Sequence, residues 1–309
     1  MDFITQESGR LDALIAAQDD DISRSAIAKA IKGGSVTVNG NVAKKPSQKI
    51  SEGDTISFTN NQQPTTNNSI DPINQNLEVL YEDDSVMVIN KPAGLTVHPG
   101  HSMDPDEPTL LSGIRYLFEE RGIPFSADSV LVHRLDKPTT GCITIAKDSS
   151  SYQKLQKQFE DRSVQKQYLA VVSGVPEHGE ATIDAPIGRN LTDRTKMSVL
   201  RTSVSREAKT SYRVLDSTDD AALLRCDLHT GRTHQIRVHL SSIGHPILGD
   251  TGYGSGESKK RSEEYSIENL CLHAERIVFA SPAISERIEV IAPLPEKFTN
   301  ALHAAGLNV

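Results

Sequence analysis

Tryptophan is absent from this sequence, aromatic residues make up only 5% of it, and cysteine occurs three times in 309 residues. Cys142, Cys226 and Cys271 stand far apart with no Cys-x-x-Cys pair, which argues against a disulfide framework and against a zinc cluster. No apolar run approaches the about 18 residues that a transmembrane helix needs, and residues 1–10 have no signal-peptide or transit-peptide pattern. We therefore expect a cytoplasmic protein without a membrane partner.

The motifs of nucleotide-dependent and metal-dependent enzymes are missing as well. There is no Gly-x-x-x-x-Gly-Lys phosphate loop, and the glycine-rich run at residues 252–256 fails the dinucleotide fingerprint at its last glycine. The sequence also lacks a His-Glu-x-x-His, a Gly-x-Ser-x-Gly and a zinc-deaminase motif. We expect no cofactor, no nucleotide and no metal, so side chains must carry any chemistry.

The charge balance is acidic, with 41 acidic and 33 basic residues and a net charge of −8. Such a balance ordinarily argues against a nucleic-acid partner, because contacts to phosphate groups require Lys and Arg side chains. The distribution of the basic residues decides the question, and several of them gather in the motifs below. On composition alone, solvated surface charges remain the alternative.

A change of composition divides the chain, whose length is that of about two domains. The stretch is polar, almost uncharged and contains two prolines, which indicates a linker at residues 61–76. This linker separates a small domain at residues 1–60 from a large one at residues 77–309.

The small domain has clear local signals. The apolar spacing predicts a helix over residues 24–32, and residues 36–42 alternate as strands around Asn39-Gly40, the preferred pair of a type I′ hairpin turn. Four basic residues on or near these elements are candidate nucleic-acid contacts: Arg24, Lys29, Lys44 and Lys45. The alternative is that they are ordinary solvated charges.

The large domain is rich in short strands and has few helices. Helical spacing occurs at residues 151–159 and 236–243, and strands are predicted at residues 77–81, 86–89, 142–146, 168–172 and 221–227. We predict the α+β class: a mixed, largely antiparallel sheet with peripheral helices, preceded by the small α/β domain. The glycines and charges of residues 254–261 predict a mobile loop.

Residues 131–148 contain the first candidate site. A polar loop punctuated by proline and glycine interrupts two apolar runs there and carries Arg134, Asp136 and Lys137 beyond a rigid scaffold. An ionised carboxylate between cations can act as a nucleophile or a general base. A surface ion pair is the alternative interpretation.

Residues 228–240 contain the second candidate site, with three histidines and two arginines around the start of a predicted helix. Arg232 and the helix start suit an anion such as phosphate. Arg237 lies at the edge of the buried face, where its guanidinium suits a forked pair with a buried carboxylate. His234 and His239 are poorly spaced for a metal, and a basic surface helix remains the alternative.

Tyr168 is the third candidate, at the head of an apolar strand. A tyrosine in such a place usually packs in the core. The functional alternative is a ring that stacks on a base and a hydroxyl that takes part in proton transfer.

The combination of motifs resembles the RluA/RluD-type family of pseudouridine synthases, over roughly residues 77–298. The resemblance rests on residues 90–98, 133–141, 166–168, 229–239, 249–254 and 270–274, which occur in the family's order. Residues 8–59 resemble the small RNA-binding domain of the ribosomal-protein-S-four type. The arrangement of the two is similar to the branch of the family that modifies large-subunit ribosomal RNA.

The resemblance implies a role for each candidate. Asp136 would be the catalytic carboxylate, Tyr168 the base-stacking and proton-handling ring, and Arg237 the partner of Asp136. Arg134 would enter the RNA stack where the target uridine has left, and extrusion of that base fits enzymes that act on folded RNA. Further RNA contacts would come from Arg232 and His234, and an apolar pocket wall from Leu270 or Leu272, between which strand alternation does not decide.

The reaction implied is cleavage of the uridine glycosidic bond, rotation of the uracil and reattachment through carbon. It needs no cofactor, and the sequence leaves open whether the aspartate attacks the anomeric carbon or abstracts a sugar proton. The partner would be structured RNA, ribosomal RNA or the assembling large subunit, with transfer RNA also open. The alternatives are a non-catalytic ribosome-assembly factor and, more weakly, a hydrolase, which would require two carboxylates.

Overall fold

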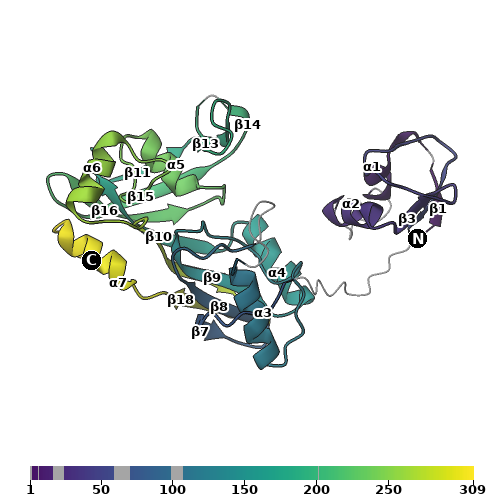
Figure 1. Cartoon of the computed structure of the whole chain (residues 1–309), viewed down its shortest axis with the longest axis horizontal. Coiled ribbons are helices and arrows are strands. Elements are labelled where there is room, and N and C mark those ends of the chain that lie inside the picture. The colour runs from purple at the N-terminus through teal and green to yellow at the C-terminus, as the bar shows by residue number, and fades with distance from the viewer. Residues whose placement is uncertain (1, 6, 17–23, 59–69, 99–106, 201) are drawn as a thin grey trace. The chain divides into compact units, whose positions relative to one another are not determined.

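The computed structural model describes residues 2–5, 7–16, 24–58, 70–98, 107–200 and 202–309, apart from the side chains of residues 2, 16, 24–26, 29, 58 and 203. The chain forms two compact units, Met1–Thr65 and Thr66–Val309 (Figure 1). Each unit has a hydrophobic core of its own.

The first unit combines two helices with short strands. Its elements are β1 (Asp2–Ile4), β2 (Gly9–Arg10), α1 (Leu11–Ala16), α2 (Arg24–Lys32), β3 (Val36–Val38), β4 (Asn41–Val42), β5 (Lys49–Ile50) and β6 (Thr55–Phe58). The strands form a sheet in the order β1-β6-β3-β4 and a separate β2-β5 pair. Ile27 and Ile31 of α2 pack with Val36 of β3 and Ile56 of β6 in the core.

Local sequence signals determine much of this unit. The predicted helix over residues 24–32 is confirmed as α2. Asn39 and Gly40 join β3 to β4 with φ angles of 51° and 77°, as the predicted type I′ turn requires. The α/β character predicted for the unit is therefore confirmed.

The second unit is built on one large sheet. Its strands are β7 (Glu78–Glu82), β8 (Val86–Lys91), β9 (Thr140–Ala146), β10 (Gln165–Ser173), β11 (Glu180–Asp184), β15 (Lys209–Ser217), β16 (Ala221–Leu228), β17 (Leu272–Ala280) and β18 (Arg287–Ile291). They follow the order β11-β15-β16-β10-β17-β9-β8-β7, and β18 pairs with β17. A smaller sheet contains β13 (Met197–Ser198), β12 (Ile187–Asn190) and β14 (Thr202–Arg206).

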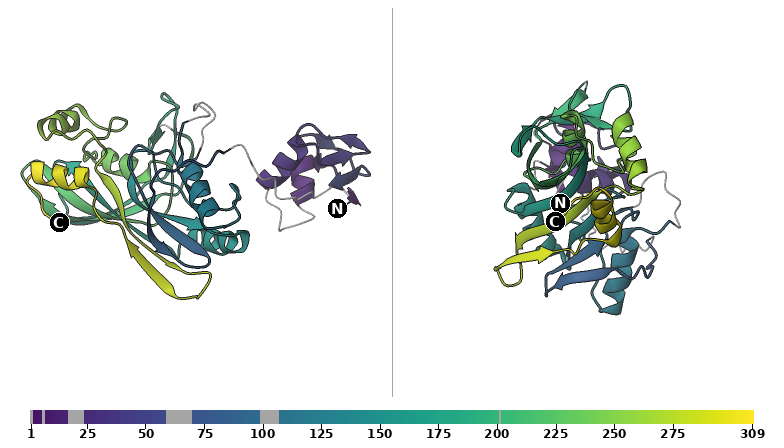
Figure 2. Two further views of the ribbon diagram at one scale, coloured as in Figure 1. Left: turned by 60° about the horizontal axis from the view of Figure 1, so that its bottom comes forward. Right: turned by 90° about the vertical axis from the view of Figure 1, so that its left-hand side faces the viewer.

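Helices cover both faces of the large sheet at its β7-β8-β9 end. Met87 and Ile89 of β8 share one cluster with the apolar side of α3 (Leu110–Glu120), whereas Val86 and Val88 share another with Leu155 of α4 (Ser149–Glu160). Figure 1 shows α3 and α4 beside these strands, and the views in Figure 2 show the sheet continuing beyond them. Every residue of β9 is buried, as expected of a strand covered on both faces.

A parallel strand pair lies in the middle of this otherwise antiparallel sheet. β9 pairs in parallel with β17 through Thr140 and Gly141, which face His273 and Ala274. Gly141 has a φ of +106°, and a Cβ at this position would lie 2.2 Å from the carbonyl oxygen of Ala274. Only glycine permits this backbone approach.

The remaining helices are α5 (Gln235–Ser242), α6 (Gly256–Glu264) and α7 (Glu296–Ala304). The prediction of a mobile loop at residues 254–261 is wrong, because most of this segment is the first part of α6, capped by the Ser255 hydroxyl. The helix packs through Ser258 and Ser262, and the latter accepts a hydrogen bond from the backbone of Gly249. Two small serines give no apolar stripe that a sequence pattern would reveal.

The predicted α+β class, with a mixed and mostly antiparallel sheet and peripheral helices, is confirmed. The helical spacing at residues 151–159 corresponds to α4 and that at residues 236–243 to α5. Among the described residues, no helix combines the length and the apolar character needed to cross a membrane.

Candidate active site

Asp136 lies in the loop that leads into β9. Its backbone carbonyl accepts a hydrogen bond from the amide of Thr139 at 3.1 Å, which closes a turn directly before the strand. The side chain is 22% exposed, so it is accessible from solvent but enclosed on most sides. The loop therefore holds the carboxyl group of Asp136 at the start of β9, a strand inside the large sheet.

Arg237 on α5 connects Asp136 to a second carboxylate. Its Nη1 donates to Asp136 Oδ2 at 3.1 Å, while Nε and Nη2 donate to the two oxygens of Asp250 at 2.8 and 2.9 Å. Burial alone would raise the pKa of Asp250, but the Arg237 fork and the amides of Tyr253 and Gly252 lower it below its ordinary value. Asp250 therefore stays ionised and fixes the guanidinium against Asp136.

Tyr253 covers the guanidinium of Arg237. The Arg237 Cζ atom lies 4.9 Å from the ring centroid, a cation–π geometry. The Tyr253 hydroxyl accepts from the amide of Met197 at 2.9 Å and is hydrogen-bonded to His234 Nδ1 at 2.7 Å. Tyr253 thus joins the small sheet to the side of α5 that carries Arg237.

His234 stands at the start of α5 in a left-handed conformation, with a φ of 55°. Its Nε2 is 3.9 Å from Asp136 Oδ1, at the edge of ion-pair distance. Burial lowers the pKa of His234 below its ordinary value, although the carboxylate of Asp136 acts in the opposite direction. At neutral pH the imidazole is therefore uncharged, and Arg237 supplies the positive charge next to Asp136.

Gln235 fixes the loop that precedes α5. Its amide nitrogen donates to the Lys209 carbonyl and the Thr210 hydroxyl of β15, at 3.0 and 2.9 Å. Its amide oxygen accepts from the Thr230 hydroxyl at 2.7 Å and from the Arg232 backbone at 3.0 Å. One buried side chain thereby attaches the loop to the sheet.

Tyr168 and Leu272 face Asp136 across a small cavity of about 80 Å³. Burial first, and then the negative charge of Asp136, raise the pKa of Tyr168 above its ordinary value, so the phenol is protonated. Tyr168 comes from β10 and Leu272 from β17, the two strands next to each other at the centre of the sheet. Tyr168, Leu272 and the carboxyl group of Asp136 thus line the same small cavity.

A second cavity of about 490 Å³ adjoins this one and shares Tyr168, Arg134 and Arg232 with it. Arg134 Nη2 donates to the Thr233 hydroxyl at 2.6 Å, an exposed hydrogen bond that joins the two site loops. The cavity beside Asp136 is smaller than the about 300 Å³ at which ligand pockets usually begin. A ligand of ordinary size at Asp136 would therefore extend into the adjoining cavity.

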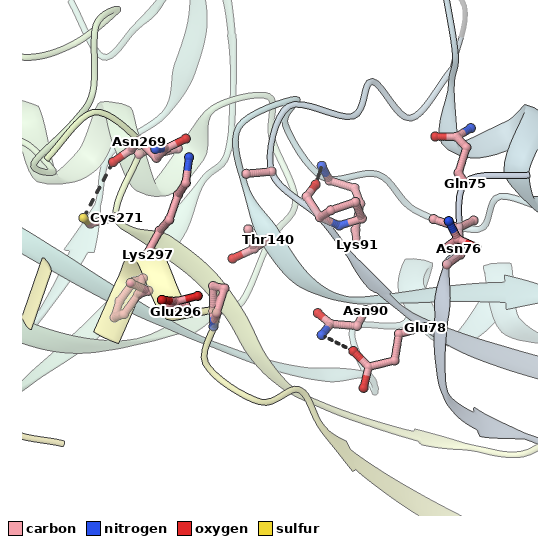
Figure 3. Close-up of a pocket in the computed structure, with 16 residues that line it drawn as sticks. Gln75, Asn76, Glu78, Asn90, Lys91, Thr140, Asn269, Cys271, Glu296 and Lys297 are labelled. Atoms are coloured by element: carbon pink, nitrogen blue, oxygen red, sulfur yellow. Dashed lines mark hydrogen bonds between the residues drawn. The ribbon is translucent and has the colours of Figure 1, made fainter. Parts of the chain in front are cut away.

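The structure brings most of the predicted site residues together. Asp136, Tyr168, Arg237, Arg134, Arg232, His234 and Leu272 line the same cavity. Leu270 does not: it lines a separate cavity of about 510 Å³ (Figure 3). Of the two leucines that the sequence left undecided, Leu272 lies at the candidate site.

The four basic residues predicted as nucleic-acid contacts of the small domain belong to the first compact unit, whereas the candidate site belongs to the second. Lys44 and Lys45 follow β4 and are exposed. Arg24 and Lys29 are on α2, but their side chains lie outside the described residues. No group of three or more His, Cys, Asp or Glu side chains suited to a metal occurs in the described part of the chain.

Residues 85–242 match the RNA pseudouridylate synthase family, slightly more than half of the chain. The chain belongs to the RNA pseudouridylate synthase family. The synthase also matches the S4 domain over residues 9–56. The two matches make it an RNA-binding isomerase, and the larger one contains Asp136, Tyr168 and Arg237.

Full-length relatives support this assignment. The synthase is 37% identical over 294 residues to the RNA pseudouridine synthase YlyB of Bacillus subtilis, itself uncharacterized, with 94% of this chain and 92% of that one covered. It is 36% identical over 299 residues to ribosomal large subunit pseudouridine synthase D of Vibrio cholerae, with 94% and 90% covered. The solved structure of human RNA pseudouridylate synthase domain containing 4 has a TM-score of 0.61 at 29% identity, with 75% and 94% covered.

Sequence reasoning missed two residues of this site. It predicted a forked pair between Arg237 and a buried carboxylate but named only Asp136 as the partner, whereas the fork goes to Asp250. Asp250 and Tyr253 both lie in the run 249–254 that carries the resemblance. A carboxylate directly before a glycine-rich turn was the available signal for Asp250.

Proposed function

We propose that this synthase converts specific uridines of large-subunit ribosomal RNA to pseudouridine in the cytoplasm. The observation that carries the proposal is the carboxyl group of Asp136, which Arg237 holds and which shares one cavity with the buried ring of Tyr168. The name of the Vibrio cholerae relative and the coverage of nearly the whole chain support the choice of RNA.

The proposed chemistry uses Asp136 as the single reactive carboxylate. The bond between N1 of uracil and C1′ of ribose breaks, the bond between C5 and C1′ forms, C5 loses its proton, and N1 gains one. Asp250 is only 1% exposed in its side chain and is engaged by Arg237, so it is not available to substrate. This argues against a hydrolase, which would place two carboxylates on the two sides of the glycosidic bond.

Tyr168 serves in this proposal as the surface on which the extruded uracil stacks. Its hydroxyl makes no hydrogen bond to any described residue, so it is free to meet the base or the sugar. Because the phenol is protonated, it starts as a proton donor rather than as a base. Leu272 would form the apolar wall opposite the ring.

The RNA strand would pass through the cavity that adjoins the site. Arg134, Arg232 and Lys166 line that cavity, and His234 lines the smaller cavity beside Asp136. Arg134 would leave Thr233 to fill the gap in the RNA stack, in accordance with the cost of a few kcal/mol for extruding a base. The domain division proposed is an RNA-binding domain at residues 1–60, a linker at residues 61–76 and a catalytic domain at residues 77–309, with Arg24, Lys29, Lys44 and Lys45 as RNA contacts of the first.

The deciding experiment is a map of pseudouridine in ribosomal and transfer RNA from cells with and without the gene. Cells that lack the gene are complemented with the parent chain, with Asp136→Asn, or with Asp84→Asn as a control at an exposed carboxylate in the β7–β8 turn. We expect particular large-subunit sites to disappear and to return with the parent and with Asp84→Asn. Asp136→Asn should bind RNA within about two-fold of the parent and restore no site.

Other outcomes point elsewhere. Loss of sites in transfer RNA alone would assign a different substrate. No lost site, together with rescue of growth by Asp136→Asn, would indicate an assembly factor without chemistry.

A further inference from the structure

Lys91 is among the largest fully buried side chains in the described structure, with no exposed surface. It ends β8 and pairs with Gly141, at the end of β9 nearest Asp136. A lysine is almost never fully buried without partners, because an ammonium group that leaves water loses its hydration. Its contacts should therefore explain why it is there.

The Lys91 ammonium donates to three backbone carbonyls. Nζ lies 2.8 Å from the oxygen of Pro92, 2.9 Å from that of Leu95 and 3.0 Å from that of Lys137. Three acceptors match the three N–H donors of an ammonium, whereas a neutral amine would offer only two donors and a lone pair. The surroundings are thus built for the protonated side chain.

The third acceptor ties Lys91 to the candidate site. Lys137 follows Asp136 directly, and its carbonyl also accepts from the Gly94 amide at 2.9 Å. The loop after β8 and the loop that carries Asp136 are therefore joined at one oxygen. In the described structure this junction lies beside the cavity of about 510 Å³ whose wall Lys91 shares with Asn90 and Thr140 (Figure 3).

The charge of Lys91 also interacts electrostatically with Asp136. No described carboxylate lies within ion-pair distance of Nζ. Burial lowers the pKa of Lys91 to about 7, and the negative charge of Asp136 acts in the opposite direction. The three carbonyl acceptors favour the ammonium against this burial, so Asp136 has Arg237 on its carboxylate and the Lys91 side chain at the backbone that carries it.

We propose that Lys91 is a positioning residue of the synthase, whose buried ammonium holds the Asp136 loop through the Lys137 carbonyl. The proposal rests on the proposed role of Asp136. Arg237 fixes the carboxylate, and Lys91 fixes the backbone from which it projects. Displacement of a catalytic group by about 1 Å can lower the rate about 100-fold. Holding the backbone of Asp136 in place can therefore outweigh the cost of burying the lysine charge.

The test compares Lys91→Met with Lys147→Met. Lys147 follows the opposite end of β9, where its ammonium likewise donates to a carbonyl, that of Asp83, and pairs with Glu82. Tritium release from RNA labelled at uridine C5 gives kcat and KM, because C5 loses its hydrogen in the reaction. We expect Lys91→Met to lower kcat by about 10-fold to 100-fold with KM within two-fold of the parent, and Lys147→Met to change neither by more than about two-fold.

Amide hydrogen exchange of residues 131–140 provides a readout that does not depend on activity. Lys91→Met should accelerate exchange in this segment by about ten-fold or more, and Lys147→Met should leave it unchanged. Should Lys91→Met fail to fold, Lys91→Gln, which keeps two donors, replaces it in both measurements with an intermediate effect expected.

The results separate this proposal from the proposed function. An inactive parent chain would overturn the function, whereas unaltered exchange at residues 131–140 would overturn the role of Lys91 regardless of activity. A kcat within two-fold of the parent, or equal losses in Lys91→Met and Lys147→Met, would also overturn it.

Discussion

At the scale of single residues, Arg237 determines the electrostatics of the site. Its guanidinium uses one edge for Asp250 and another atom for Asp136, and its face lies against Tyr253. The planar fork of an arginine meets these three demands together, which a lysine cannot. Burial of the Arg237–Asp250 pair makes both partners necessary, because either one alone would be an uncompensated buried charge.

Replacement of Asp250 by alanine tests this dependence. We expect Asp250→Ala to lower the free energy of unfolding by about 3 kcal/mol, since one member of a buried ion pair is removed, and to lower kcat by freeing Arg237 from its position. Urea unfolding monitored by circular dichroism measures the first effect.

The chain offers a matched control for that measurement. Arg162 and Glu207 form the same two-bond fork, with both distances 2.9 Å, but the pair is exposed. Glu207→Gln should leave the urea midpoint unchanged within error. Equal midpoints for Asp250→Ala and the parent chain would mean that the buried fork contributes nothing to the fold.

At the scale of elements, the parallel contact between β9 and β17 brings the site together. It joins the strand after Asp136 to the strand that begins with Leu272. The contact depends on Gly141, whose positive φ and absent Cβ allow the backbone of Ala274 to approach. The same pair of strands therefore positions Leu272 and the loop that carries Asp136.

Gly141→Ala is expected to destabilise the second unit by about 2 to 4 kcal/mol, the sum of a strained backbone and a backbone clash. Gly40→Ala provides the control, because Gly40 also has a positive φ but nothing lies within 4 Å of the point that an added methyl group would occupy. Thermal unfolding should show a clear drop in the midpoint for Gly141→Ala. A smaller effect than for Gly40→Ala would contradict the close approach.

Sequence patterns predicted the elements whose signals are local. The helices α2 and α4 and the hairpin at Asn39-Gly40 follow from apolar spacing and turn chemistry, and the structure confirms them. The helix α6 has no apolar stripe, and the contact of its buried Ser262 with Gly249 exists only after folding. Its glycines and charges therefore predicted a loop.

The candidate site was predictable in its residues but not in all their partners. The charged loop around Asp136 and the arginines of residues 228–240 stood out on their own. The choice between Leu270 and Leu272 depends on which residue reaches the cavity, a property of strand position rather than of alternation. Asp250 was missed because its partner lies 13 positions earlier, across a turn that sequence spacing does not specify.

At the scale of the whole molecule, the two units have separate cores, and the proposed function assigns RNA binding to the first and chemistry to the second. Acidic residues exceed basic ones by 41 to 33. Affinity for RNA must therefore come from local groups of Lys and Arg, which neutralise phosphates where they stand. Phosphate contacts in both units would together strengthen RNA binding. They would not change the rate of the step that breaks and forms the glycosidic bond.

Removal of residues 1–65 tests the division. We expect the fragment 66–309 to fold on its own core and to keep its kcat within about three-fold at saturating RNA, while its affinity for ribosomal RNA falls by about ten-fold or more. The slope of log affinity against log salt concentration should become shallower, because fewer phosphates are contacted. A fragment with full affinity would show that the first unit contributes nothing to substrate binding.

The position of β17 in the sheet has a consequence for biosynthesis. β17 is made after β9 and β10 but lies between them. A nascent chain that stops short of residue 272 leaves two strand edges open in the middle of its largest sheet, and open edges promote aggregation. The chain also lacks Leu272 until then, so the cavity beside Asp136 is complete only when the last strands leave the ribosome.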